Sequence, residues 1–330
     1  MDVFVTGGSG YVGNHVIPLL VARGHRVLAL ARSQAAAAQV SALGAQVVRG
    51  DVTESGAWCE SAERTEAIVH LAMPSRGTGR RAWDWTPFSA RWVRLVEAFE
   101  TRALDQLIAA AGRNPRLRAL ITTTGPAASG HHPGCAFIDE DCLGSSSSFG
   151  AVQRMTERRT LAAAESGIPA TVLRPGAVYG ADGGFAARLL RDALRGRVAY
   201  AGRGDNYLSW VHIRDYARSY VAAVEAGGLG RVVAIVDDEP LTSRAAMQEL
   251  AAACGGGRPR SAPSWLVRLT QGPVVHGWAT GSARLRNDRA KQLLGFAPSF
   301  PNVRVGFAAT VHEFRLAQTA VAHTEQSVRD

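Results

Sequence analysis

Lysine is almost absent from this 330-residue sequence, since Lys291 is the only one and arginine supplies the other basic residues. Cysteine is also scarce, and its four positions are irregularly spaced, at Cys59, Cys135, Cys142 and Cys254. This spacing does not fit a disulfide framework and indicates reduced thiols. No apolar run is long enough to cross a bilayer, and the first residues carry no secretory signal pattern. We therefore expect a cytoplasmic protein without a membrane partner.

Basic residues exceed acidic ones, which gives a formal net charge of +9. An excess of positive charge can indicate binding to nucleic acid. Here the arginines are interspersed with acidic residues and form no run of five or six. The pattern predicts a solvated basic surface with some arginines facing an anionic ligand, and no nucleic-acid partner.

The first half of the chain alternates short apolar segments with longer amphipathic ones. The apolar segments predict strands at 3–6, 27–31, 46–49, 67–71, 117–122 and 170–174. The intervening segments predict helices at 11–23, 34–43, 55–62, 89–111 and 149–166. Buried strands that alternate with helices predict an α/β fold, a doubly wound parallel Rossmann sheet.

The second half has a different rhythm. It predicts helices at 185–195, 215–226, 288–294 and 305–318, strands at 210–213 and 232–236, and a linker rich in Gly, Pro and Arg at 255–263. We expect a nucleotide-binding domain of residues 1–178, to which 206–236 return. A smaller C-terminal substrate lobe would then comprise 179–205 and 237–330.

A glycine-rich loop follows the first predicted strand and opens the first helix. Gly7 allows the tight turn, Gly10 lets the backbone approach a pyrophosphate, and Gly13 lets the helix pack closely on the strand. The helix N-terminus supplies free N–H groups to an anion. This context predicts a dinucleotide site that includes Gly7, Ser9, Gly10, Tyr11, Val12 and Gly13.

The second predicted strand ends in Arg32 and Ser33 rather than in an acidic residue. An acid at this place would bind the ribose 2′-hydroxyl of NAD, whereas arginine and serine can bind a 2′-phosphate. The sequence therefore favours NADP(H) over NAD(H). The alternative is that Arg32 only stacks on the adenine.

Several further motifs appear in a familiar order. They are Gly50-Asp51-Val52, Val69-His70-Leu71-Ala72, Leu173-Arg174-Pro175-Gly176-Ala177-Val178-Tyr179-Gly180 and Trp210-Val211-His212-Ile213-Arg214-Asp215. Together with the glycine loop they resemble the extended short-chain dehydrogenase/reductase family, the NAD(P)-dependent epimerase/dehydratase group, to about Pro298. The resemblance implies cofactor contacts from Asp51, Val52, Leu71, Ala72, Met73, Thr122, Pro175, Gly176 and Val178.

The catalytic pattern of that family is not preserved. Its members use a hydroxyl that orients the substrate oxygen, a Tyr acid/base, and a Lys four residues later. Thr124 matches the hydroxyl, but Phe149 stands in place of the Tyr and Gln153 in place of the Lys. Since the residue four before Lys291 is Asn287, no Tyr-x-x-x-Lys exists anywhere in the chain. Losing a positioned general acid costs about 10²–10⁴ in rate, so another group replaces it or the chemistry differs.

Histidine is the first candidate for a replacement acid, because it titrates near neutrality. His132, or its neighbour His131, lies in the loop after the fifth strand, which is expected to overhang the nicotinamide. The spacing of these histidines to Cys135 and Cys142 is not that of a standard zinc site, so no metal is expected. The substrate pocket is expected to include Trp83, Trp85, Phe149, Gln153 and Tyr179.

Three functions remain open at this point. The first is an NADP(H)-dependent reductase or dehydrogenase of a small organic molecule, such as a secondary metabolite, in which Thr124 holds the substrate oxygen and a non-standard group donates the proton. The second is a redox-neutral cyclase, lyase or isomerase, and the third is a non-catalytic NADP(H) sensor. The sequence does not decide the oligomeric state, and a homodimer is compatible with it.

Overall fold

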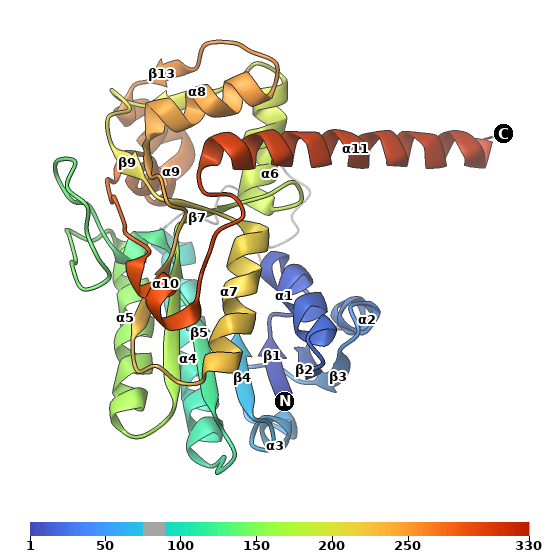
Figure 1. The fold of residues 1–330 in the computed structure, drawn as a ribbon. Coiled ribbons are helices and arrows are strands. Elements are labelled where there is room, and N and C mark those ends of the chain that lie inside the picture. Colours follow the sequence, from blue (N-terminus) through green and yellow to red (C-terminus); the bar gives the residue numbers. More distant parts are fainter. Residues whose placement is uncertain (75–89, 330) are drawn as a thin grey trace.

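The computed structural model describes residues 1–74 and 90–329, without the side chains of 184–187 and 320–329. Its centre is a seven-stranded parallel sheet with the order β11-β6-β5-β4-β1-β2-β3 (Figure 1). The strands are β1 (Asp2–Thr6), β2 (Arg26–Ala31), β3 (Gln46–Arg49), β4 (Ala67–His70), β5 (Ala119–Thr123), β6 (Ala170–Pro175) and β11 (Val232–Ile235). The predicted doubly wound α/β fold is confirmed, and each predicted strand of this sheet lies within two residues of an observed one.

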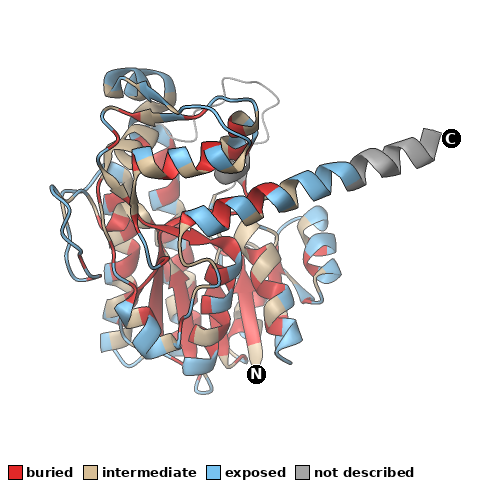
Figure 2. Ribbon diagram, turned by 45° about the horizontal axis from the view of Figure 1, so that its top comes forward, coloured by how far each residue is buried: buried red, intermediate tan, exposed pale blue. Residues whose placement is uncertain are grey.

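Apart from the mostly exposed edge strand β3, the sheet is buried on both faces, and Figure 2 shows its central strands as largely buried. One face packs on α1 (Tyr11–Ala22), α2 (Gln34–Ala42) and α7 (Ile213–Ala226). The other packs on α3 (Trp58–Ala62), α4 (Ala90–Gly112) and α5 (Ser148–Glu165). The chain runs from β1 to β2 and β3 on one side and then crosses to β4 on the other side of β1. A crevice therefore opens at the carboxyl ends of β1 and β4, where such folds bind ligands.

A second, smaller core lies beyond the carboxyl edge of the sheet. It is built from α6 (Gly184–Leu194), α8 (Ser243–Ala253), the first turns of α11 (Val303–Arg329) and aromatic residues around Tyr179 and Trp210. Three short strand pairs join it: β7 (Ala177–Tyr179) with β10 (Trp210–His212), β9 (Tyr207–Leu208) with β12 (Leu241–Thr242), and β8 (Ala199–Ala201) with β13 (Arg260–Ala262). The elements α9 (Ser264–Thr280), α10 (Asp288–Leu294) and the 3₁₀ turn η2 (Pro126–Ala128) complete the structure.

Two predictions for the C-terminal half are corrected by the structure. The segment 255–263 is not simply a linker, because its end forms β13 and pairs in parallel with β8. The last helix is longer than 305–318, since α11 runs from Val303 to Arg329 and its distal part extends away from the rest of the molecule (Figures 1 and 2). In the described residues, no helix has the length and apolarity to cross a bilayer.

Candidate functional site

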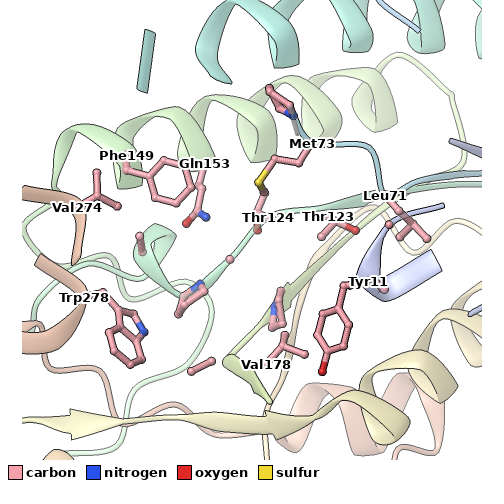
Figure 3. A pocket seen from close by; sticks show the side chains of 18 of the residues that line it. Tyr11, Leu71, Met73, Thr123, Thr124, Phe149, Gln153, Val178, Val274 and Trp278 are labelled. Atoms are coloured by element: carbon pink, nitrogen blue, oxygen red, sulfur yellow. The ribbon is translucent and has the colours of Figure 1, made fainter. Parts of the chain in front are cut away.

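A large cavity of about 1090 Å³ lies at the carboxyl ends of the strands, and residues of both the sheet domain and the smaller core line it. Its lining begins at the glycine loop, passes the ends of β2, β4, β5 and β6, and ends against α9. Figure 3 shows this cavity from close by. Its size and its position at the switch point of the sheet suit a long ligand with one end on β2 and the other on α5.

The glycine loop provides the turn and the open face that a pyrophosphate needs. Gly7 has a φ of 73°, and a Cβ there would lie 2.4 Å from the Ala72 nitrogen. Gly10 is the N-cap of α1 in an extended conformation, and an added Cβ would meet only the Gly7 oxygen, at 3.1 Å. The space beside Gly10 is therefore open to a ligand. Gly13 lies outside the lining and packs against Gly8 instead.

The β2 end of the cavity is lined by Arg32, Ser33 and Asp51. The Ser33 hydroxyl accepts a hydrogen bond from the Ala36 N–H (3.2 Å) and so caps α2, whose N-terminus faces the same end. Burial raises the pKa of Asp51, but hydrogen bonds from Thr53 and the charge of Arg32 outweigh burial and lower it overall. A guanidinium, a hydroxyl and a helix N-terminus together suit an additional phosphate.

The three threonines at the end of β5 point to alternate faces of the sheet. The Thr122 hydroxyl bonds the Thr160 hydroxyl (3.0 Å) in the core and does not line the cavity. Thr123 lines the cavity and bonds Tyr220 of α7. Thr124 also lines it, and its hydroxyl donates to Glu157 Oε1 (2.9 Å).

The Thr124 hydroxyl donates its hydrogen bond to a buried ion pair formed by Glu157 and Arg174. Glu157 also accepts two hydrogen bonds from the Arg174 guanidinium, both 2.8 Å long, and Arg174 donates a third to the Glu140 carbonyl. Glu157 and Arg174 are 4% and 1% exposed, so water does not compete for these bonds. In this arrangement the Thr124 oxygen can accept a hydrogen bond from a ligand but has no proton left to donate to a substrate carbonyl.

Phe149 and Gln153 lie one turn apart on α5 and both line the cavity. Figure 3 shows them projecting from this helix into the cavity, near Val274 of α9. The Phe149 ring packs on Trp92 of α4, with 5.1 Å between ring centroids. The Gln153 side chain makes no hydrogen bond to any residue that the structure describes, and its Oε1 is buried. This end of the cavity therefore has an apolar wall and an uncharged amide.

Two other predicted site residues, His132 and Tyr179, do not line the cavity. His132 does not line the cavity; its Nε2 donates to the Ser129 carbonyl (3.1 Å), whereas the neighbouring His131 does line it. Tyr179 does not line it either, because its ring is packed inside the smaller core against Trp210, His212 and Phe307. Burial raises the pKa of Tyr179 above its usual range, which makes it a poor proton donor. Trp83 and Trp85 lie outside the described residues.

The remaining predicted cofactor residues all line the cavity: Ser9, Tyr11, Val12, Val52, Leu71, Ala72, Met73, Pro175, Gly176 and Val178. Sequence reasoning missed the contribution of α9. Gly272 has a φ of 81° ahead of Pro273, and this kink directs Val274 and Trp278 over the cavity (Figure 3). The Gly-Pro pair was the available signal, but nothing in the sequence showed what the following residues would cover.

Comparisons with known proteins agree with this architecture. The model of the NAD dependent epimerase/dehydratase family matches residues 3–235. The chain belongs to this family. Among its relatives is the 3-diazoavenalumate denitrifying reductase of a Streptomyces species, which is 29% identical over 93% of this chain and 99% of that protein. The 2-alkyl-3-oxoalkanoate reductase of Stenotrophomonas maltophilia is 29% identical over 83% and 82%.

A third relative is named as a ketoreductase. It is the 4-hydroxy-2-methyl-3-oxo-4-farnesyl-3,4-dihydroquinoline-1-oxide ketoreductase of Stigmatella aurantiaca, 30% identical over 74% of this chain and 70% of that protein. Among solved structures, the human epimerase family protein SDR39U1 with NADPH has a TM-score of 0.77 at 24% identity, and the comparison covers 94% of this chain and 99% of that one. This structural likeness supports the fold.

The residues present fit the family's nicotinamide dinucleotide. The cradle at Gly10 is open where a pyrophosphate would lie, α1 begins beside it, and the cavity continues from Arg32 to Gln153. When bound, such a cofactor supplies or accepts a hydride. The site thus combines an open glycine loop with Phe149 and Gln153 at the far end of the same cavity.

Proposed function

We propose that this protein is an NADPH-dependent reductase of a small organic molecule that transfers a hydride without the family's tyrosine acid. The observation that carries the proposal is the pairing of an open glycine cradle with Phe149 and Gln153 at the far end of one cavity. Arg32, Ser33 and the N-terminus of α2 favour the phosphorylated cofactor. Phe149, Val274 and Trp278 form an apolar wall that suits a flat or apolar substrate and excludes water.

Phe149 and Gln153, in place of a tyrosine and a lysine, favour a hydride acceptor that needs no proton from the protein. A carbonyl oxygen becomes an alkoxide when its carbon accepts a hydride, so its reduction needs an acid. An arenediazonium is already cationic. Hydride and cation combine to give the arene and N₂, with no proton taken from a side chain. The relative named as a 3-diazoavenalumate denitrifying reductase supports this class of acceptor.

The neutral Gln153 is also consistent with a cationic acceptor. A lysine at this position would place a positive charge in the cavity and repel a diazonium group. Gln153 carries no charge, and the Thr124 oxygen presents lone pairs because its proton is on the bond to Glu157. Nearby, Glu157 is neutralised by Arg174. These residues leave the reacting end of the cavity without a repelling cation among the described side chains.

Carbonyl reduction is the second candidate, favoured by the position of His131. This histidine lines the cavity, and its Nδ1 accepts a hydrogen bond from the Ser282 N–H (3.1 Å), which leaves the ring proton on Nε2. The Nε2–H of this ring can donate a hydrogen bond to a carbonyl oxygen in the cavity. The names of the oxoalkanoate reductase and the ketoreductase support this substrate class.

The test is NADPH oxidation with two kinds of acceptor, 4-methoxybenzenediazonium and a 2-alkyl-3-oxoalkanoate ester, using cofactor with deuterium at C4. We expect NADPH consumption, N₂ release and deuterated anisole with the diazonium. The Gly10→Val variant, which should not bind cofactor, measures the uncatalysed reaction.

The other outcomes separate the remaining functions. Reduction of the oxo ester alone would favour the second candidate. Conversion of a substrate without net change in nicotinamide would indicate redox-neutral chemistry. Cofactor binding with no turnover of either acceptor would contradict the proposal and favour a sensor.

A further inference from the structure

We infer that the Gln153 Oε1 and the Thr124 hydroxyl oxygen form a hydrogen-bond-accepting subsite of the cavity, so that the substrate carries an O–H or N–H group on a flat apolar skeleton. The inference rests on the proposed function in one respect, that this cavity holds the substrate. It adds the chemical group by which the substrate is recognised.

The amide of Gln153 provides an acceptor that the protein itself does not use. Gln153 is 8% exposed, and its Oε1 is buried without a hydrogen-bond partner among the described residues. The residue lines the cavity, and Figure 3 shows its amide end pointing from α5 into it. A buried acceptor without a donor is costly, so a ligand that donates a hydrogen bond to Oε1 gains affinity.

The backbone after β5 holds this amide next to Thr124. Gly125 follows Thr124 directly, and a Cβ added to Gly125 would lie 2.5 Å from the Gln153 Nε2 and 3.5 Å from its Oε1. The amide therefore packs against the chain segment that carries Thr124, although the two residues belong to different elements. Thr124, Gly125 and Gln153 all line the cavity, so a ligand at this end meets them together.

Thr124 provides the second acceptor. Its hydroxyl donates to Glu157 Oε1 (2.9 Å), and Glu157 is fixed by two hydrogen bonds from Arg174. The hydroxyl oxygen therefore keeps its lone pairs for a ligand and has no proton to offer it. Two acceptor oxygens at the same end of the cavity repel a carboxylate and attract the positive end of an O–H or N–H bond. The same oxygens are compatible with the cationic acceptor of the proposed function.

The lining around the two acceptors is apolar. Trp92 and Phe149 pack on each other with 5.1 Å between ring centroids, and Val274 belongs to the same cluster. Trp278 also lines the cavity. Such surroundings bind a flat body and exclude the water that would otherwise satisfy the two oxygens. The occupant that fits both the wall and the acceptors is a flat apolar molecule with a hydrogen-bond donor.

Two ligands of the same shape test the inference without any turnover. Indole has an N–H donor and no lone pair available as an acceptor, whereas benzofuran has a ring oxygen in place of the N–H. Calorimetric titration of the full chain, saturated with NADP⁺, should show about 10-fold tighter binding of indole, because only indole satisfies the buried acceptor. A second pair, 2-naphthol and 2-methoxynaphthalene, repeats the comparison for an O–H donor. A preference in one pair only would identify the donor as N–H or as O–H.

Variants locate the effect. Gln153→Met keeps the length of the side chain but removes the acceptor, and should abolish the 10-fold advantage of indole with little change for benzofuran. Gln153→Glu keeps an acceptor oxygen at the same distance along the side chain and should retain the advantage. Thr124→Val removes the second acceptor at nearly unchanged shape and should lower the advantage. Gln248→Met, at an exposed position of α8, is the matched control and should change nothing.

Three results would overturn the inference. They are equal affinities within both ligand pairs, no binding of any of the four ligands, and a loss of NADP⁺ affinity in Gln153→Met with the indole advantage unchanged, which would assign the amide to the cofactor. If any of these is found while 4-methoxybenzenediazonium is still reduced, the proposed function stands and the accepting subsite does not. An indole advantage that depends on Gln153, in a protein that reduces neither kind of acceptor, would support the subsite and contradict the proposed function.

Discussion

At the scale of the residue, we expect Arg32 to decide the choice between NADPH and NADH. It lines the cavity at the end of β2 beside Ser33, where a 2′-phosphate would lie. Arg32→Ala should weaken NADPH binding by about 10–100-fold, the value of a charge-assisted hydrogen bond, and should leave NADH binding almost unchanged. Titration of nicotinamide fluorescence measures both affinities. Arg49→Ala is a suitable control, because Arg49 donates to the Ser33 carbonyl (2.8 Å) and does not line the cavity.

Equal affinity of the unmodified protein for NADPH and NADH would contradict this prediction. It would mean that Arg32 stacks on the adenine, or that its charge only stabilises the ionised carboxylate of Asp51, whose pKa it helps to lower.

We expect Phe149 and Gln153 to determine which reaction the site can perform. Restoring the family's pair with Phe149→Tyr and Gln153→Lys should not raise turnover of a diazonium substrate, since that reaction needs no acid and the added lysine repels a cation. The same double variant should gain weak reduction of a 3-oxo ester. NADPH oxidation with each acceptor measures the two effects. A large gain with the diazonium would show that proton transfer limits the native reaction.

At the scale of a single element, α7 is capped by a histidine that stays neutral. The His212 Nδ1 accepts a hydrogen bond from the Arg214 N–H (3.2 Å), which keeps the ring proton on Nε2. Burial, and then the charge of Arg214, lower the pKa of His212 to about 3. The unfolded chain therefore binds a proton below about pH 6.5 that the folded protein does not bind, and stability falls as the pH falls from 6.5 towards 3.

This coupling makes a prediction that the pH dependence of unfolding can test. Between pH 6.5 and pH 5, His212 should cost the protein about 2 kcal/mol of unfolding free energy. His212→Asn keeps a good N-cap but does not titrate, so its stability should change less over that interval. Urea unfolding at both pH values provides the comparison. Identical slopes in the two proteins would mean that the ring is protonated in the native state.

At the scale of the whole molecule, the cofactor site connects the two cores. The cavity is lined by the glycine loop and strand ends of the sheet domain and also by Trp210 and Trp278 on the side of the smaller core. A ligand that binds only the folded state stabilises it by about 2.7 kcal/mol at 100 times its Kd. NADPH at that excess should raise the unfolding free energy by this amount.

Gly10→Val is the matched control for this measurement. The Gly10 backbone has a φ of −85°, which any residue adopts, and the nearest neighbour of an added Cβ is the Gly7 oxygen. The variant should therefore fold, as circular dichroism would show, but show no stabilisation by NADPH, because its side chain fills the space of the pyrophosphate. Stabilisation by NADPH in this variant would show that Gly10 serves only the turn.

The order of strands and helices and the glycine cradle could be predicted from the sequence, because they depend on local patterns. Apolar runs of four to six residues, Gly7 and Gly10 in a strand–turn–helix context, and the lack of any Tyr-x-x-x-Lys are all visible in the sequence. The directions in which side chains point could not be predicted from the sequence. Thr122 and Thr124 face α5 and Thr123 faces α7, an alternation whose meaning depends on which helix covers each face.

The sequence by itself therefore determined the fold class and the family, and it predicted the glycine loop at the edge of the cavity. Only the tertiary structure decided that the Thr124 hydroxyl donates its hydrogen bond to Glu157. It also decided that Tyr179 lies in the smaller core rather than in the cavity, and that His131 rather than His132 lines the cavity. It further decided that α9, about 120 residues after Phe149, packs beside the N-terminal half of α5 and lines the same end of the cavity. Such contacts join residues far apart in the chain, and their partners are selected by packing, which no local pattern records.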